Sequence, residues 1–315
     1  MPKNCAIVIG GPTASGKSQL AIDLARAFDG VVINADASQV YKSIPVISAA
    51  PSAEDMQKVP HRLYGYLDDE EGCNVVAWLE DAAAAIRETH AAGKIPVVVG
   101  GGGLYLDNLI NGVTPIPEVD PLIRAQALTI VARQGLGALY EQLRAVDPEG
   151  AAMVSPTDTT RVRRAFEIFM TTGISVAEWF LRPMIKKLPE TDFLTIKLLP
   201  AKAELDCRCD LRFDIMTASG AVEEVENLLT RGVPENLPVM KAKGVPELAA
   251  FLRGEIGFEE ASAKAKLHTR QYAKRQLTWF RNKFDAALVT GECYSGRPDF
   301  INDVKKQYNM LQKFA

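Results

Sequence analysis

The chain has 315 residues, of which 47% are hydrophobic and 24% are charged, and its formal net charge is −3. This length and composition are typical of a globular protein with two domains, or with one domain that carries a large insertion. The net charge excludes nucleic-acid binding through an overall basic surface, so any basic surface has to be local. The five cysteines are scattered and predict free thiols. With no apolar run of spanning length and no signal pattern, we expect a cytoplasmic protein without a membrane segment.

The first part of the chain alternates short apolar runs, glycine turns and helices. Residues 6–9 predict a buried strand, and the helix that follows runs from Lys17 to Phe28. A second strand ends at Asp36, and a helix over 75–92 precedes a third strand, IPVVV, which runs into four glycines. This alternation predicts an α/β fold with a parallel sheet and right-handed crossovers.

The middle of the chain has a different pattern. From about residue 120 to 173 the periodicity is helical throughout, and a strand pattern returns only with FLTIKLLP at 193–200. From Leu205 to about Phe284 helices dominate again. We therefore expect a core of residues 1–119 and 190–315, with a helical C-terminal part, and a helical insertion domain at 120–189.

The segment GPTASGKS matches the phosphate-loop pattern G-x-x-x-x-G-K-[ST] without a mismatch, after a strand and at the start of a helix. Glycines allow backbone N–H groups to turn towards phosphate oxygens, and the helix N-terminus adds partial positive charge. Lys17 supplies a full charge, and the Ser18 hydroxyl is a ligand for Mg²⁺, the expected cofactor. The predicted diphosphate or nucleotide site consists of Gly11, Pro12, Thr13, Ala14, Ser15, Gly16, Lys17 and Ser18.

The third strand ends in glycines, where phosphate-loop enzymes that hydrolyse nucleotides usually carry a carboxylate. The carboxylate of Asp36 instead ends the second strand, in a predicted polar cluster with Gln39 and Tyr41. Carboxyl ends of parallel strands share one edge of the sheet, so we expect Asp36 to face the phosphate loop. It could bind Mg²⁺ through water, act as a general base on an acceptor, or cap the turn.

Two segments are candidates for contacts with nucleic acid. Arg161 and Arg164 lie one turn apart on a predicted helix that Asp158 could cap. Residues 264–283 contain seven Lys or Arg and no Asp or Glu. This second helix should have a basic stripe and an apolar stripe on different faces, the first formed by Lys266, Arg270 and Lys274 and the second by Ala273, Leu277, Phe280 and Phe284. A solvated basic face is the alternative.

Seven segments occur in a fixed order: GPTASGKS, NADASQVY, PHRLYGYL, VVVGGGGLY, DTTRVRRAFEI, LRFDIMTASGAVEEV and TRQYAKRQLTWFR. Together they resemble the tRNA dimethylallyltransferase, or tRNA isopentenyltransferase, family from about residue 6 to 281. The resemblance implies a P-loop NTPase-like core and transfer of a dimethylallyl group from dimethylallyl diphosphate. The implied acceptor is N6 of adenine 37, 3′ of the anticodon, in tRNAs that read codons beginning with U. Diphosphate then leaves, and no hydrolytic carboxylate is needed.

The resemblance also implies roles for single residues. Asp36 takes the proton from the adenine N6, while Lys17 and Arg212 neutralise the diphosphate that Thr13 and Ser18 contact. The adenine has to leave its stack to reach this site. The implied tRNA-contacting residues are Asp36, Ala37, Ser38, Gln39, Gly102, Arg124, Thr160, Arg161, Val162, Arg163, Arg164, Arg270 and Lys274. The expected partners are tRNA and dimethylallyl diphosphate, and we expect a monomer.

The chain departs from the family pattern at four places. Ala37 replaces the serine of D-S-x-Q, Gly102 replaces the threonine of G-G-T-G-L-Y, and Ala50 replaces the basic residue of T-A-K/R-P. The pattern G-Y-K/R reads Gly244-Val245-Pro246. The chemical centre is thus complete, but the polar shell around the acceptor is reduced.

Three alternatives remain open at this point. An adenylate isopentenyltransferase would use free AMP, ADP or ATP, but it would need neither the helical insertion nor the basic helix. A small-molecule P-loop kinase would turn over ATP. A catalytically weak, RNA-binding paralogue would fit the reduced polar shell, but not the retention of Lys17 and Asp36.

Overall fold

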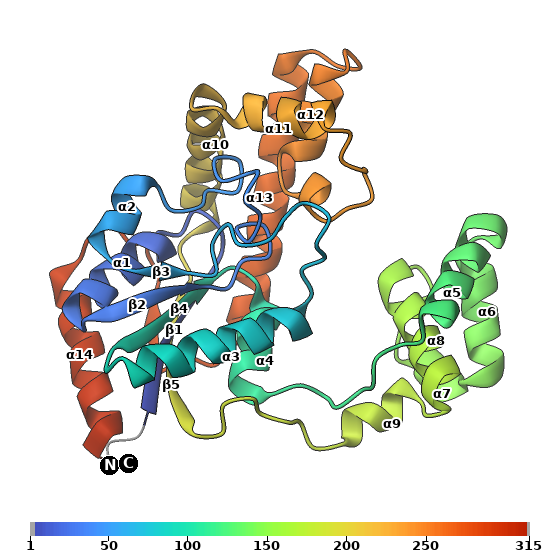
Figure 1. Ribbon diagram of the computed structural model, residues 1–315, viewed down its shortest axis with the longest axis horizontal. Coiled ribbons are helices and arrows are strands. Elements are labelled where there is room, and N and C mark those ends of the chain that lie inside the picture. The colour runs from blue at the N-terminus through green and yellow to red at the C-terminus, as the bar shows by residue number, and fades with distance from the viewer. Residues whose placement is uncertain (1–3, 314–315) are drawn as a thin grey trace. The chain divides into compact units, whose positions relative to one another are not determined.

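The computed structural model describes residues 4–313 (Figure 1). The chain divides into two compact units. One unit ends at Ile110 and resumes at Lys187, and the other spans Asn111–Lys186. Compared with this unit, the predicted insertion, 120–189, begins nine residues too late and ends three residues too late.

The first unit is built on a parallel sheet, which the described residues form from six strands in the order β3-β2-β4-β1-β5-β6. The strands are β1 (Asn4–Gly10), β2 (Gly30–Asn34), β3 (His61–Arg62), β4 (Ile95–Gly100), β5 (Thr191–Leu198) and β6 (Leu288–Thr290). The central strands are rich in buried Val and Ile, as expected of a sheet covered on both faces. The parallel sheet of the sequence analysis is confirmed, with β3 and β6 as additional short strands.

The helices of this unit are α1 (Lys17–Ala27), α2 (Ala53–Lys58), α3 (Val75–Ala91), α4 (Gly103–Asn111), α10 (Lys202–Ala218), α11 (Ala221–Thr230), α12 (Val245–Leu252), α13 (Phe258–Lys283) and α14 (Pro298–Lys313), with a 3₁₀ turn at Val239–Lys241. From β1 the chain crosses through α1 to β2, and it returns through α3 to β4, which lies between them. Right-handed crossovers in opposite directions place their helices on opposite faces of the sheet. The α1 side chains Leu20 and Leu24 accordingly pack on Ile7, Ile9 and Val97.

The helices α10 to α13 form a second core beside the sheet. Phe213, Val225, Val245 and Leu248 pack there on Ile47 and its neighbours in the loop that follows β2. The last helix, α14, returns to the sheet and adds Phe300 and Val304 to the core around α1. Helices were predicted only to about Phe284, so α14 was not predicted, although Phe300 and Val304 have helical spacing.

The second unit is helical, as predicted. Its helices are α5 (Pro121–Gln134), α6 (Leu136–Val146), α7 (Pro148–Ala152), α8 (Thr159–Thr172) and α9 (Val176–Leu181). Leu139, Leu143, Phe166 and Trp179 belong to its buried core. The carboxylate of Asp158 accepts a hydrogen bond of 3.0 Å from the Arg161 N–H and caps α8, as expected. Within residues 4–313, no helix is long and apolar enough to cross a bilayer.

Candidate active site

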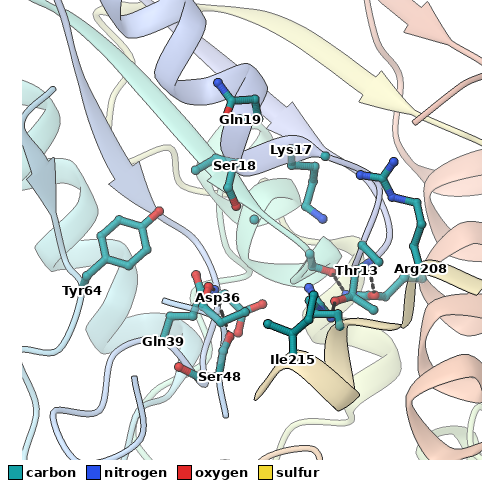
Figure 2. A pocket seen from close by; sticks show the side chains of 18 of the residues that line it. Thr13, Lys17, Ser18, Gln19, Asp36, Gln39, Ser48, Tyr64, Arg208 and Ile215 are labelled. Atoms are coloured by element: carbon teal, nitrogen blue, oxygen red, sulfur yellow. Dashed lines mark hydrogen bonds between the residues drawn. The ribbon is translucent and has the colours of Figure 1, made fainter. Parts of the chain in front are cut away.

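A cavity of about 580 Å³ lies at the carboxyl ends of the central strands. This is the edge of the sheet where β1 ends and the chain connections run to either side, which is where parallel α/β sheets bind ligands. The lining comes from the phosphate loop, the loops after β2 and β4, Tyr64, α10 and α13 (Figure 2). The structure therefore brings the phosphate loop and Asp36 into one cavity, as the sequence predicted.

The phosphate loop has the backbone of an anion site. Ala14 and Gly16 have positive φ angles of 64° and 89°, and Gly16 starts helix α1 without a side chain of its own. The first N–H groups of the helix are thus left for a ligand. A Cβ at Gly16 would lie 2.2 Å from the carbonyl oxygen of Tyr294, so the position requires glycine for space as well as for conformation.

Lys17 points into this cavity. Its Nζ donates a hydrogen bond of 2.5 Å to the carbonyl oxygen of Pro12. Burial lowers the pKa of the Lys17 ammonium to about 7, against the opposing effect of Asp36 and with a further contribution from Arg212. A bound diphosphate would supply negative charge that favours the protonated ammonium.

Arg212 reaches the same loop from α10. Its guanidinium donates a hydrogen bond to the Thr13 hydroxyl, and burial lowers its pKa, with Cys209 and Asp36 acting in the opposite direction. Arg208, one turn earlier, also lines the cavity. Arg208 was not among the predicted site residues, although its spacing of four from Arg212 places both side chains on one helix face.

Asp36 is held by a buried neighbour, Asn34. The Asn34 Oδ1 accepts from the Asp36 N–H at 2.9 Å, and its Nδ2 donates to the Asp36 carbonyl at 3.0 Å and to the Leu63 carbonyl at 2.9 Å. The Asp36 carboxylate in turn accepts from the Ser38 N–H at 2.9 Å. Asn34 therefore fixes the backbone that carries Asp36, a role that the sequence analysis missed.

The predicted polar cluster of Asp36, Gln39 and Tyr41 is only partly right. Gln39 lines the cavity, and its Nε2 donates to the carbonyl oxygens of Ser48 and Ala49 at 3.0 and 2.7 Å. Tyr41, by contrast, is 2% exposed and belongs to the core that includes Ile44, while its hydroxyl donates to a loop carbonyl. Tyr41 is a structural residue.

A buried glutamine of α13 joins two loops of the site. Gln276 Oε1 accepts from the Thr13 N–H at 2.8 Å, and its Nε2 donates to the Gly101 carbonyl at 2.8 Å. Its signal in the sequence is a polar residue inside an apolar stripe, beside Leu277. The apolar stripe itself is confirmed, since Ala273, Leu277, Phe280 and Phe284 are all buried.

The basic stripe of α13 is mostly engaged within the protein. Nη1 of Arg270 donates to both carboxylate oxygens of Asp210 on α10, at 2.7 and 2.6 Å, and Lys266 pairs with Asp214 at 2.6 Å. Lys274 is exposed. In the structure, acidic residues of α10 thus pair with Lys266 and Arg270, and contact of this stripe with RNA phosphates stays a prediction that requires these ion pairs to be exchanged.

The predicted tRNA contacts of the second unit lie on α5 and α8. Arg124, Thr160, Arg161 and Arg164 are exposed there. Arg161 pairs with Asp158 at 3.4 Å, and Arg163 and Arg164 both pair with Glu167, at 3.2 and 4.0 Å. Val162 is fully buried in the core of this unit. Its side chain packs the helices and is not available to tRNA.

The four departures from the family pattern have different surroundings. Val245 is fully buried against the core of α10 to α13, and Pro246 stands in the first turn of α12, where proline is favoured. A Cβ at Gly102 would lie 3.1 Å from the Ala35 carbonyl oxygen, a tight but not prohibitive distance. Ala37 and Ala50 are half-buried in the loop that follows β2.

Comparisons with known proteins found similar sequences over most of the chain. A family model described as IPP transferase matches residues 39–283. A tRNA dimethylallyltransferase of Sphingopyxis alaskensis is 47% identical over 277 residues, which are 88% of this chain and 89% of the relative. One of Rhodospirillum centenum is 46% identical over 289 residues, 91% and 92% of the two chains.

Two solved structures are similar over most of the chain. The full-length tRNA isopentenylpyrophosphate transferase of Bacillus halodurans has a TM-score of 0.70 and 31% identity, over 99% of this chain and 97% of that one. A eukaryotic dimethylallyltransferase acting on tRNA has a TM-score of 0.77 and 32% identity, over 90% of this chain and 73% of that one.

Proposed function

The chain belongs to the IPP transferase family, and we propose that it transfers a dimethylallyl group from dimethylallyl diphosphate to N6 of adenine 37 in tRNAs that read codons beginning with U. The observation that carries this proposal is that phosphate-loop residues, Arg212 and Asp36 line one shared cavity. It combines a cradle for a leaving diphosphate with a carboxylate that can accept a proton.

The donor binds through its diphosphate. The open N–H groups at the start of α1, the Lys17 ammonium and the Arg212 guanidinium all face this group. An allylic C1–O bond breaks readily once the charge that develops on the diphosphate is stabilised, and fixed cations in a partly enclosed cavity provide that stabilisation.

The acceptor reacts on the side of Asp36. The N6 nitrogen attacks C1 of the dimethylallyl group, the C1–O bond breaks, and diphosphate leaves with the bonding electrons. The Asp36 carboxylate takes one proton from N6, so the product is a neutral secondary amine. Asn34 and the Ser38 N–H hold Asp36 in position for this transfer.

Mg²⁺ is part of the proposal. The exposed Ser18 hydroxyl and the Asp36 carboxylate line the same cavity and are oxygen donors of the kind Mg²⁺ accepts. Among the residues described here, no group of three or more His, Cys, Asp or Glu is placed to hold a metal. Diphosphate oxygens and water would therefore supply most ligands, and the ion would offset charge on the leaving group.

Basic residues on both units are proposed to bind the tRNA backbone. Arg124, Arg161 and Arg164 are exposed on the second unit, and Lys274 is exposed on α13. Such contacts position an RNA without reading its sequence, and they give salt-dependent affinity. The protein is proposed to act as a monomer.

One assay tests the function. Purified protein, Mg²⁺ and dimethylallyl diphosphate are offered unmodified tRNA with A36 and A37 beside the anticodon, and in parallel free AMP, with the products measured by mass. Prenylated tRNA alone is the expected product. Prenylated AMP alone would identify an adenylate isopentenyltransferase, and bound but unmodified tRNA would identify a catalytically inactive RNA-binding protein.

A further inference from the structure

Two large apolar side chains are exposed inside the cavity. Leu211 and Ile215 of α10 are 62% and 56% exposed, and both line the α10 wall of the cavity. They lie one turn apart on the same helix face. Exposed Leu and Ile are common on protein surfaces, but here they face a site that is otherwise lined mainly by glycines, hydroxyls, amides and charges.

The same helix face carries the two arginines of the site. Along α10, Arg208, Leu211, Arg212 and Ile215 follow one another at spacings of three and four, so cationic and apolar side chains are neighbours. Arg212 is fixed by its hydrogen bond to the Thr13 hydroxyl. In Figure 2, Ile215 lies between the side of Thr13 and Arg208 and the side of Asp36 and Ser48.

This arrangement matches a ligand that has an anionic end joined directly to an apolar chain. We propose that Leu211 and Ile215 form the seat of the five-carbon chain of the prenyl diphosphate donor and select donors by that chain. The inference rests on the proposed function. Contact with the chain would remove apolar surface of both partners from water.

A second hollow of about 60 Å³ adjoins the cavity at Thr13, Asp36 and Arg212. Its apolar walls, among them Phe213 and Met216, are already buried. A prenyl chain there would therefore remove less apolar protein surface from water than one that covers Leu211 and Ile215. An adenine, moreover, needs hydrogen-bonding partners for its polar edges, which an apolar wall does not offer. The donor chain is therefore the occupant that fits Leu211 and Ile215.

The test compares a ligand that carries the five-carbon prenyl chain with a ligand that lacks it. Leu211→Asn and Ile215→Asn are exposed substitutions, so the fold should persist. Dissociation constants are measured by calorimetry for dimethylallyl diphosphate and for inorganic pyrophosphate, and the KM for tRNA is measured by transfer. We expect affinity for dimethylallyl diphosphate to fall about tenfold, with pyrophosphate affinity and the tRNA KM nearly unchanged. Ile215→Leu should retain donor affinity, and Met56→Gln, an exposed change on α2 outside the cavity, is the control.

Three results would overturn this inference: an equal loss for both ligands, no loss for either, or a rise in the tRNA KM with donor affinity intact. The last would place the acceptor against this wall. Failure of the proposed function is a different observation, because wild-type protein would then make no prenylated tRNA. The dissociation constants of dimethylallyl diphosphate and pyrophosphate would still show whether Leu211 and Ile215 bind the five-carbon prenyl chain.

Discussion

The backbone N–H of Thr13, in the phosphate loop, donates a hydrogen bond of 2.8 Å to the side chain of Gln276, which is 263 residues later in the sequence. The other end of the same amide donates to Gly101 in the loop after β4. One buried side chain therefore sets the distance between the two loops that flank the donor site.

Gln276→Leu should loosen both loops. The change leaves the Thr13 N–H and the Gly101 carbonyl without this partner, at a cost of about 1–3 kcal/mol for each group that stays buried. We expect a lower melting temperature and weaker pyrophosphate binding. Gln271→Leu, an exposed change on the same helix, serves as the control. Equal pyrophosphate affinity in the two variants would show that Gln276 does not organise the phosphate loop.

The sequence predicted the parts of the site that depend on local pattern. The phosphate loop follows from eight consecutive residues, and the place of Asp36 follows from the rule that parallel strands end at one edge. The role of Gln276 depends on how α13 packs on the sheet, which no local pattern contains. The same reason explains Arg270, because its partner Asp210 becomes visible only when α10 lies along α13.

The prediction for Tyr41 failed for a different reason, because a polar side chain is not always an exposed one. Tyr41 looked like part of a polar cluster, but its ring is buried, and its hydroxyl donates to the Glu71 carbonyl and accepts from the Cys73 N–H. The strands β3 and β6 have two and three residues, too few for periodicity to identify them.

Lys17 should make donor binding depend on pH. Because burial lowers its pKa to about 7 in the free protein, much of the ammonium is neutral at pH 8, and binding of the anionic donor should take up a proton. The same shift implies that the unfolded chain holds this proton more tightly, so the free energy of unfolding should rise between about pH 7 and the ordinary lysine value of 10.5.

Calorimetry at pH 8 in buffers of different ionisation enthalpy measures this proton uptake with dimethylallyl diphosphate. Lys17→Arg keeps the charge without titrating, so it should bind the donor with less proton uptake than the wild type, and Lys17→Ala should bind it more weakly. Identical proton uptake in wild type and Lys17→Arg would exclude Lys17 as the titrating group.

Asp36→Ala should abolish most transfer while leaving tRNA binding nearly intact. A general base contributes about 10²- to 10⁴-fold to a rate, and the remaining contacts to the RNA do not depend on this carboxylate. Single-turnover prenylation and a filter-binding affinity for tRNA measure the two effects separately. Asp36→Asn retains an acceptor for the Ser38 N–H and controls for the turn. Normal turnover in Asp36→Asn would remove this residue from the chemistry.

Asn34→Ala tests whether the backbone under Asp36 has to be fixed. The side chain is fully buried and makes three hydrogen bonds, so its loss should lower stability by about 1–3 kcal/mol. If Asn34 positions the base, kcat should fall while the donor KM changes little. A drop in melting temperature with unchanged kcat would identify Asn34 as purely structural.

Gly102 and Gly100 form a matched pair, because a Cβ on either residue would approach the same atom. The Ala35 carbonyl oxygen would lie 2.1 Å from a Cβ at position 100 and 3.1 Å from one at position 102. The first distance requires the backbone to move, since a carbonyl oxygen in the core has no rotamer to change, and overpacking of this kind typically costs about 1–3 kcal/mol. The second requires a shift of a few tenths of an ångström at most.

Gly100→Ala should therefore lower the melting temperature clearly, whereas Gly102→Ser should keep it close to the wild-type value. In addition, Gly102→Ser places a hydroxyl where the family resemblance implies a contact with tRNA, so we expect a lower KM for tRNA. Unfolding of Gly102→Ser to the same extent as Gly100→Ala would show that glycine is required at 102 for packing, and that its presence there says nothing about the acceptor.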